Sequence, residues 1–231
     1  MESLWQNKTK LPHFSSLSGD IQTDVLVIGG GMAGLLTAYS LRRKGMDVVV
    51  AEKERICSGT TAGTTAKITA QHGLIYHKIA KAYGETHANM YYTANTEAVR
   101  NLKQLCTEAG CHPEIKDNFV YSPDPRKLEA ELSALYRLGI SAKYISTLPV
   151  PVTAAGAVGF AEQGQFDPLQ LANFLSQCLT IYEHTKVTEL KGTTAVTEFG
   201  NIRAKKIVVA THFPFLNKHG SYFLKLYQHR S

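Results

Sequence analysis

The sequence predicts an α/β fold in which helices flank a parallel β-sheet. Two short runs, "TDVLVIGGG" and "MDVVVAEKE", are rich in apolar and β-branched residues, which is typical of strands buried in such a sheet. Between them, Met32 to Lys44 has the length of a helix, and Gly45 suits its C-terminal end. Residues 24–52 therefore form a strand–turn–helix–strand unit of βαβ size.

The first predicted strand runs into three consecutive glycines, each of which costs backbone entropy. Gly29, Gly31 and Gly34 match the pattern G-x-G-x-x-G between a strand and a helix. In that pattern the first glycine permits a tight turn, the second admits a pyrophosphate close to the backbone, and the third lets helix and strand pack closely. The N–H groups that begin the helix would bind the diphosphate.

Glu52 ends the second predicted strand, 18 positions after Gly34, which is close to the roughly 20 expected of a dinucleotide motif. Its carboxylate can accept hydrogen bonds from ribose hydroxyls and would repel a 2′-phosphate, so we expect an adenosine-type dinucleotide other than NADP. The alternative is that the glycines only make a tight turn and Glu52 is a surface carboxylate.

The chain after Glu52 does not continue as regular βαβ units. A loop rich in Gly, Ser and Thr, "RICSGTTAGTTAKITAQHG", comes first, and residues 76–109 then read as helical with a break at Gly84. A late strand, "KKIVVAT", would return to the first sheet. This layout favours FAD over NAD, because an NAD domain would continue with regular βαβ units.

The other elements are short. "DPRKLEAELSALYRLG" and "DPLQLANFLSQCL" each predict a helix that begins with an Asp N-cap and a Pro. Short strands are expected at "NFVYS", "AKYIS" and "AVGFAEQGQF", and "HTKVTELKGTTAVTEFGNIRAKKIVVATHFP" predicts three strands joined by turns. The passage into "TIYEHTKV" lacks the usual turn residue, which leaves open whether residues are missing near Thr180.

The composition excludes several classes of protein. The chain has 231 residues, 44% hydrophobic, and a formal charge of +6 from scattered Lys and Arg, so we expect no nucleic-acid partner. We expect no bound metal, because the cysteines fit no disulfide or zinc spacing. With no apolar leader and no run of roughly 20 apolar residues, we expect a cytoplasmic protein without a membrane span. The cysteines are Cys57, Cys106, Cys111 and Cys178.

The stretches "VLVIGGGMAGLLTAYSLRRKGMDVVVAEK", "GTTAGTTAKITAQHG", "HTKV" and "IVVATHFPF" together resemble the glycine/D-amino-acid oxidase (DAO) family of FAD-dependent oxidoreductases. The likeness extends to a bacterial subgroup often fused to a C-terminal Rieske iron–sulfur domain, and "TTAKITAQHGLIY" is the more specific part of it. The resemblance implies an FAD-binding Rossmann-like domain of the glutathione-reductase type, with a parallel sheet, helices and an added β-meander. The substrate domain would be incomplete.

The resemblance also implies residue roles. The glycines would hold the pyrophosphate of FAD, Glu52 the adenosine ribose, and the threonine-rich loop would line the pyrophosphate and the flavin. The alternative for each threonine is a loop residue that bonds its own backbone. No catalytic residue is predicted, although Gln71, His72 and His212 are considered. The predicted cofactor-binding residues are Gly29, Gly31, Met32, Ala33, Gly34, Glu52, Lys53, Thr60, Thr61, Thr65, Ala66, Val187, Ala210 and Thr211.

Four regions are expected along the chain. They are a lead-in (1–20), an FAD-binding βαβ unit with its loop (21–75), a helical insertion with short strands that forms part of a substrate domain (76–165), and a return to the FAD-binding domain (166–231). Because the chain stops within the apolar stretch "FLKLYQHRS", we expect the N-terminal portion of a longer enzyme.

The implied activity is oxidation of an amine or amino acid by hydride transfer to the flavin, with an electron acceptor that the sequence does not identify. Two alternatives remain open. One is a non-catalytic dinucleotide-binding module or truncated homologue, and the other is an NAD-binding dehydrogenase domain.

Overall fold

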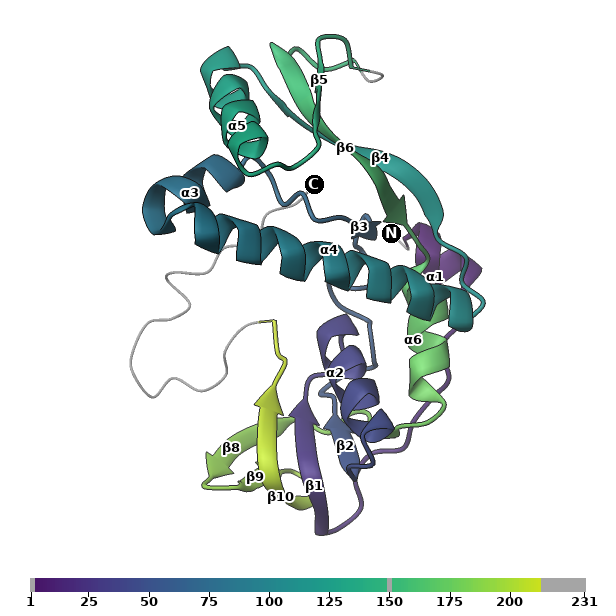
Figure 1. Ribbon diagram of the computed structural model, residues 1–231. Helices are drawn as coiled ribbons and strands as arrows, with labels where there is room; N and C mark the ends of the chain where they lie inside the picture. The colour runs from purple at the N-terminus through teal and green to yellow at the C-terminus, as the bar shows by residue number, and fades with distance from the viewer. Residues whose placement is uncertain (1–2, 149–150, 213–231) are drawn as a thin grey trace. The chain divides into compact units, whose positions relative to one another are not determined.

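The structure is a computed structural model that describes residues 3–148 and 151–212 (Figure 1). The chain divides into two compact units. The first consists of Met1–Thr65 and Asp167–Ser231, and the second of Ala66–Phe166. The first unit is therefore assembled from two segments that are remote in sequence, whereas the second is continuous.

The first unit contains the predicted parallel sheet. Strand β1 (Ile21–Ile28) pairs in parallel with β2 (Val48–Ala51) on one side and with β10 (Gly200–Val209) on the other. A further strand, β7 (Thr180–Tyr182), pairs in parallel with β2. All four residues of β2 are buried, as a strand inside a parallel sheet requires.

A β-meander extends this sheet beyond β10. Strands β8 (Val187–Lys191) and β9 (Thr194–Thr197) are antiparallel, and β9 is antiparallel to β10, which gives the order β7-β2-β1-β10-β9-β8. Gly192 turns the first hairpin with a φ of 60°, a conformation that few side chains adopt. These are the three strands that the sequence predicts here.

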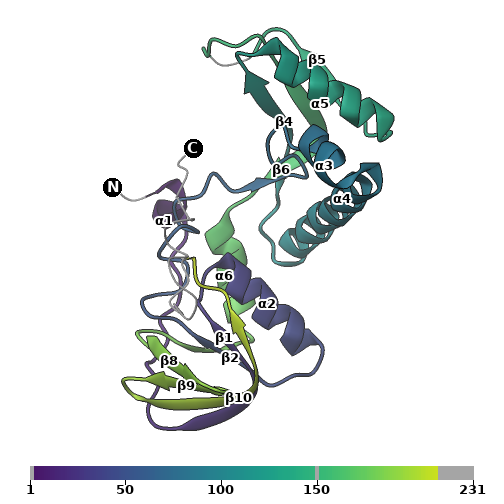
Figure 2. The ribbon, with the colours of Figure 1, turned by 90° about the vertical axis from the view of Figure 1, so that its left-hand side faces the viewer.

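Two helices lie on one face of this sheet, as Figure 2 shows. Helix α2 (Met32–Arg43) begins at the predicted residue and ends one residue before the predicted Lys44, which is its C-cap. Helix α6 (Pro168–Ser176) is capped by Asp167, whose side chain accepts a hydrogen bond from Leu169 N. The predicted lead-in contains a short helix, α1 (Leu4–Lys8), which begins with a capping box between Ser3 and Gln6.

The second unit is built on an antiparallel sheet. Its central strand β6 (Gly156–Gln165) pairs with β4 (Glu114–Ser122), β3 (Lys67–Ile68) and β5 (Lys143–Ile145). Strand β3 falls within the stretch predicted as a long loop. Two residues are too few to show a sequence period, and their pairing with β6 makes them a strand.

Helices α3 (Tyr76–Tyr83), α4 (Glu85–Glu108) and α5 (Pro125–Arg137) cover one face of the second sheet (Figure 2). As predicted, Gly84 separates α3 from α4, with a φ of 88°. Asp124 caps α5 by accepting a hydrogen bond from Arg126 N.

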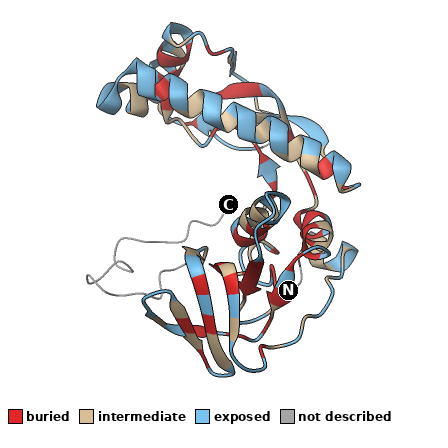
Figure 3. Cartoon of the chain, turned by 60° about the horizontal axis from the view of Figure 1, so that its bottom comes forward, coloured by how far each residue is buried: buried red, intermediate tan, exposed pale blue. Residues whose placement is uncertain are grey.

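Each unit has its own core. In the first, Leu26, Val49 and Ile202, which lie on β1, β2 and β10, belong to one buried hydrophobic cluster. In the second, Tyr76 and Phe160 lie at the centre of an aromatic and aliphatic cluster, with their ring centroids 5.9 Å apart. Figure 3 shows buried residues gathered on the strands, while α4 is exposed over most of its length.

Two further features concern membrane spans and the passage near Thr180. Among residues 3–148 and 151–212, no helix has both the length and the apolar character needed to cross a bilayer. Near Thr180, α6 passes into β7 through a short turn in which Leu179 N donates to Ser176 O.

Candidate functional site

The glycine turn between β1 and α2 has no room for side chains at two of its predicted positions. A Cβ at Gly34 would lie 1.9 Å from the carbonyl oxygen of Gly29, and a Cβ at Gly29 would lie 2.8 Å from that of Ala210. Gly29 also has a φ of 109°, which favours glycine. These two glycines therefore make the turn compact, as the motif predicts.

Gly31 has different surroundings, because the space in front of it is open. A Cβ there would meet only the Thr61 hydroxyl oxygen, at 3.6 Å. Gly31 is the N-cap of α2, and it makes no side-chain capping hydrogen bond. The start of α2 thus combines an open approach to the backbone with the positive end of the helix dipole, which is what a bound diphosphate requires.

Residues 55–65, here called the threonine loop, contact the start of α2. Met32 N donates to Thr61 Oγ1 at 3.1 Å, and Cys57 N donates to Gly30 O at 3.0 Å. Ala33, in the first turn of α2, is exposed. The structure therefore brings the predicted residues Met32 and Thr61 into direct contact.

Glu52 lies at the end of β2 beside the same turn. Its Oε2 accepts a hydrogen bond from Gly30 N at 2.6 Å, and its Oε1 accepts one from Glu54 N at 2.9 Å. Thr185 N donates to the backbone oxygen of Glu52 at 2.8 Å. These bonds hold the carboxylate at the carboxyl end of the parallel strands, where α/β sheets bind ligands.

The end of β10 closes the turn on its other side. Ala210 N donates to Ile28 O at 2.8 Å, so Ala210 and Thr211 pass beside Gly29. Among the described residues, the buried Thr211 Oγ1 has no hydrogen-bond partner. A buried hydroxyl without a partner costs free energy, which a ligand atom at this place would recover.

The remaining predicted residues lie in several different surroundings. Lys53, Thr60 and Thr65 are exposed. Val187 is buried in the core of the first unit at the start of β8, two positions after Thr185, which bonds to Glu52. Ala66 belongs to the second unit, where it has a φ of 53° and its carbonyl oxygen accepts a hydrogen bond from Phe166 N.

The sequence did not reveal two residues that shape the threonine loop, Glu183 and Arg55. Glu183, fully buried after β7, accepts hydrogen bonds from Ile56 N at 2.8 Å and from Phe14 N at 3.1 Å. Arg55 Nε lies 3.4 Å from Glu183 Oε2. A carboxylate at the end of a strand beside β2 is the signal that could have found Glu183, but β7 itself was too short to recognise.

Cys57 is a buried residue of the threonine loop with an unusual backbone φ of 55°. Its Sγ donates to Gly30 O at 3.6 Å. Burial raises the pKa of this thiol to about 12, and the nearby Glu52 charge acts in the same direction. The thiol is therefore protonated and unreactive at neutral pH.

Gln71, His72 and His212, the three residues considered for a catalytic role, have different surroundings. Gln71 is buried in the second unit, where Nε2 donates to Val158 O and Oε1 accepts from Asn118. His72 is exposed and bonds to the Tyr91 hydroxyl at 2.8 Å. His212 is exposed and directly follows Thr211.

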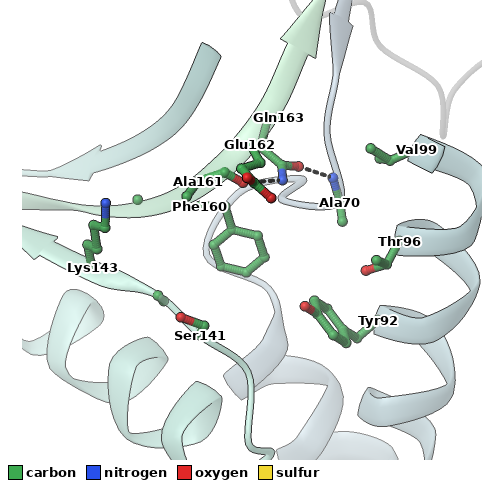
Figure 4. Close-up of a pocket in the computed structure, with 12 residues that line it drawn as sticks. Ala70, Tyr92, Thr96, Val99, Ser141, Lys143, Phe160, Ala161, Glu162 and Gln163 are labelled. Carbon is green, nitrogen blue, oxygen red and sulfur yellow. Dashed lines mark hydrogen bonds between the residues drawn. The ribbon is translucent and has the colours of Figure 1, made fainter. Parts of the chain in front are cut away.

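The second unit contains a pocket of about 240 Å³ between α4 and β6 (Figure 4). Tyr92 and Phe160 form an aromatic wall, and Gln163 bonds to Ala70 N and Ala161 O on another side. None of the predicted cofactor residues lines it. Among the described residues, no cluster of His, Cys, Asp or Glu has a metal-binding arrangement.

The fold and the glycine turn together define an α/β dinucleotide-binding protein with a second unit inserted between β2 and β7. The sequence model of the FAD dependent oxidoreductase (DAO) family matches residues 24–228. The chain therefore belongs to this family, as the resemblance predicted, and FAD is the family's cofactor.

Curated relatives agree with this assignment. The chain is 35% identical, over its whole length, to YhfW of Bacillus subtilis (strain 168), described as a Rieske 2Fe–2S iron–sulfur protein, and it covers 48% of that protein. It is 27% identical to the gamma-glutamylputrescine oxidoreductase of Escherichia coli (strain K12), with 87% of the chain and 51% of that protein aligned. The chain thus spans about half the length of these relatives.

Solved structures share the fold. Glycine oxidase from Geobacillus kaustophilus superposes with a TM-score of 0.65 at 17% identity, with 82% of this chain and 55% of that chain covered. L-proline dehydrogenase from P. horikoshii superposes with a TM-score of 0.64 at 21% identity, with 84% and 54% covered. The predicted FAD-binding Rossmann-like fold is therefore confirmed.

Proposed function

We propose that the first unit of this chain binds FAD at the glycine turn, as part of an oxidoreductase that acts on an amine or amino acid. The open space in front of Gly31 is the observation that carries the proposal. A Cβ would clash at Gly29 and Gly34, where the backbone is tightly packed. It would fit at Gly31, where a ligand would lie.

The chain's own groups fit the polar part of FAD. The N–H groups that begin α2, including that of Ala33, would donate to the diphosphate, and the Thr61 hydroxyl lies beside them. The Glu52 carboxylate would accept hydrogen bonds from the adenosine ribose. Thr211 Oγ1 would gain a partner from the bound cofactor.

The other predicted residues complete the proposed site with less direct support. Lys53 would lie beside the adenosine, and the backbone at Val187 would contact the adenine. Thr60, Thr65 and Ala66 would line the diphosphate and flavin along the threonine loop and its continuation.

When bound, FAD supplies the two-electron acceptor that lets a C–H bond beside an amine give up hydride and leave an imine. The chain's part in this is to bind and orient. The names of gamma-glutamylputrescine oxidoreductase, glycine oxidase and L-proline dehydrogenase describe amine or amino-acid chemistry in those proteins, and they support the same substrate class here.

A titration tests the proposal. The chain is titrated with FAD and with NAD, and binding is followed by flavin fluorescence and by calorimetry. We expect saturable FAD binding, and about tenfold weaker binding in Glu52→Gln, because the amide accepts fewer hydrogen bonds from the ribose. Glu54→Gln is the matched control, since Glu54 is an exposed carboxylate two positions away.

Tight NAD binding without FAD binding would contradict the proposal and select a dehydrogenase domain. If FAD binds, turnover over a panel of amines and amino acids, with oxygen or an artificial dye as acceptor, tests the activity. FAD binding without turnover on any of them would favour a non-catalytic binding module.

A further inference from the structure

The N-terminal arm, residues 3–17, is bonded to the segments around the glycine turn, although the sequence gives it no motif. Trp5, in α1, donates from its indole Nε1 to the carbonyl oxygen of Thr64 at 2.8 Å. The two residues are 59 positions apart, and the contact ties α1 to the end of the threonine loop.

The start of the threonine loop is held by the middle of the arm. Arg55 donates from Nη2 to the carbonyl oxygens of Pro12, at 2.7 Å, and of Leu11, at 3.2 Å. Its Nη1 donates to His13 Nε2 at 3.2 Å. A guanidinium bonded to two successive carbonyl oxygens fixes both its own direction and that of the arm.

Glu183 joins the arm and the loop through one buried carboxylate. Its Oε2 accepts from Phe14 N and its Oε1 accepts from Ile56 N. Leu17 N then donates to Thr185 Oγ1 at 3.0 Å. The arm is therefore bonded to both segments that leave the carboxyl ends of β2 and β7.

The loop carries these contacts to the start of α2. Thr64 N donates to Thr61 O at 3.5 Å, and the Thr61 hydroxyl accepts from Met32 N. At the other end of the loop, Cys57 N donates to Gly30 O. Hydrogen bonds at Thr64 and Thr61, joined through the covalent chain of these two residues, thus connect the Trp5 indole to the first helical N–H of α2.

We propose that the N-terminal arm is a positioning element for FAD binding, in which the bond from Trp5 to Thr64 and the bonds from Arg55 of the loop to the arm hold the threonine loop against the glycine turn. This inference rests on the proposed FAD site. Ordering the loop before the cofactor arrives lowers the entropy lost on binding, so an arm that holds the loop raises affinity without touching FAD.

Trp5→Phe is the direct test, because it removes the indole donor and keeps an aromatic ring. In the chain without FAD, we expect the amides of Ala62 and Gly63 to exchange with deuterium about three to ten times faster, while amides of β1 and β2 keep their rates. FAD affinity should fall by a similar factor, about three- to tenfold. A loss of overall stability alone would not produce this local pattern.

Leu4→Ala is the matched control. Leu4 lies in the same helix and is 58% exposed, so the substitution should change neither the loop exchange nor the FAD affinity. Unchanged exchange of the loop in Trp5→Phe would overturn the inference. Faster exchange with an unchanged FAD affinity would overturn it equally.

A second variant keeps the test decisive if Trp5→Phe does not fold. Arg55→Lys retains the charge beside Glu183 but loses the paired bonds to Leu11 and Pro12, and it should loosen the same loop amides. The exchange measurement needs no cofactor. A wild-type chain that binds no FAD would therefore overturn the proposed function, while the exchange rates would still decide whether the arm holds the loop.

Discussion

Within residues 3–148 and 151–212, each unit fully buries one glutamate, and the two carboxylates have different hydrogen-bond partners. Glu131, in α5 of the second unit, accepts from Tyr76 N at 3.0 Å and His77 N at 2.9 Å, and it caps the start of α3. Glu183, in the first unit, accepts from Phe14 N and Ile56 N, which belong to two irregular segments.

The difference shows how one interaction can serve stability or function. Glu131 satisfies the orphan N–H groups of a helix, which would need a partner in any protein. Glu183 instead accepts from backbone N–H groups that lie outside any helix or strand. One of them, that of Ile56, belongs to the threonine loop, which contacts the glycine turn. Glu183 therefore orders the loop that the proposed FAD site uses, whereas Glu131 stabilises the start of a helix in the second unit.

The two units can be compared further by substitution, and the largest loss of stability is expected in the first unit, from Gly34→Ala at the glycine turn. Its Cβ would lie 1.9 Å from Gly29 O, and because a backbone oxygen cannot move aside as the end of a flexible side chain can, β1 and α2 would have to separate. We expect a loss of about 3 kcal/mol or more in the free energy of unfolding, measured by urea denaturation.

Ser40→Ala is the control for that experiment, since Ser40 is an exposed residue of the same helix. It should change the free energy of unfolding by no more than about 0.5 kcal/mol. A Gly34→Ala variant as stable as wild type would show that the turn is looser than described.

Glu183→Gln should have the next largest effect. The amide retains one acceptor but places an NH₂ group against a backbone donor and removes the charge that faces Arg55, so we expect a loss of about 3 kcal/mol. Amide exchange should rise in residues 55–65 and in the arm. Exchange that rises evenly over the whole chain would contradict the assigned role.

Glu131→Gln provides the counterpart in the second unit. We expect a loss of about 2 kcal/mol, because hydrogen bonds to Tyr76 N and to His77 are weakened at the start of α3. FAD affinity of the folded protein should remain that of wild type. An affinity loss equal to that of Glu52→Gln would remove the distinction between the two glutamates.

The sequence predicted the parts of this structure that depend on local patterns. Three patterns could be recognised from the sequence, namely the glycine motif, the Asp N-caps and the β-branched strands. Each of them has one physical cause within a few residues. The sequence could not predict β3 and β7, which are two and three residues long and exist only through pairing with β6 and β2.

The candidate site was predicted to a similar extent. Glu52 and the turn follow from spacing alone. The contacts of Trp5 and Glu183 join positions between 59 and 169 residues apart, and no local pattern records such a distance. Thr211 was predicted from the resemblance, but only the structure shows that its hydroxyl is buried without a partner among the described residues.

The smallest effect concerns two exposed ion pairs, one in each unit. A hydrogen bond from Lys205 lowers the pKa of Asp24, and one from Arg126 lowers the pKa of Asp124, both below the ordinary value of 3.8. A lowered pKa in the folded state stabilises the protein above pH 3.8, and this stabilisation is lost as the pH falls through the folded value.

Thermal unfolding at about pH 5 and about pH 3 measures this loss. Asp24→Asn and Asp124→Asn should each make the melting temperature slightly less dependent on pH. Glu129→Gln, at an exposed position of α5, is the control. Identical pH profiles in all variants would show that neither pair contributes.

The most direct test of the central claim is FAD binding by Gly31→Ala. A Cβ there meets only Thr61 Oγ1 at 3.6 Å, so the chain should keep its stability to within about 0.5 kcal/mol. The same Cβ would occupy the space assigned to the diphosphate, and FAD affinity should fall at least about tenfold. A stable Gly31→Ala variant that binds FAD as tightly as wild type would contradict the account.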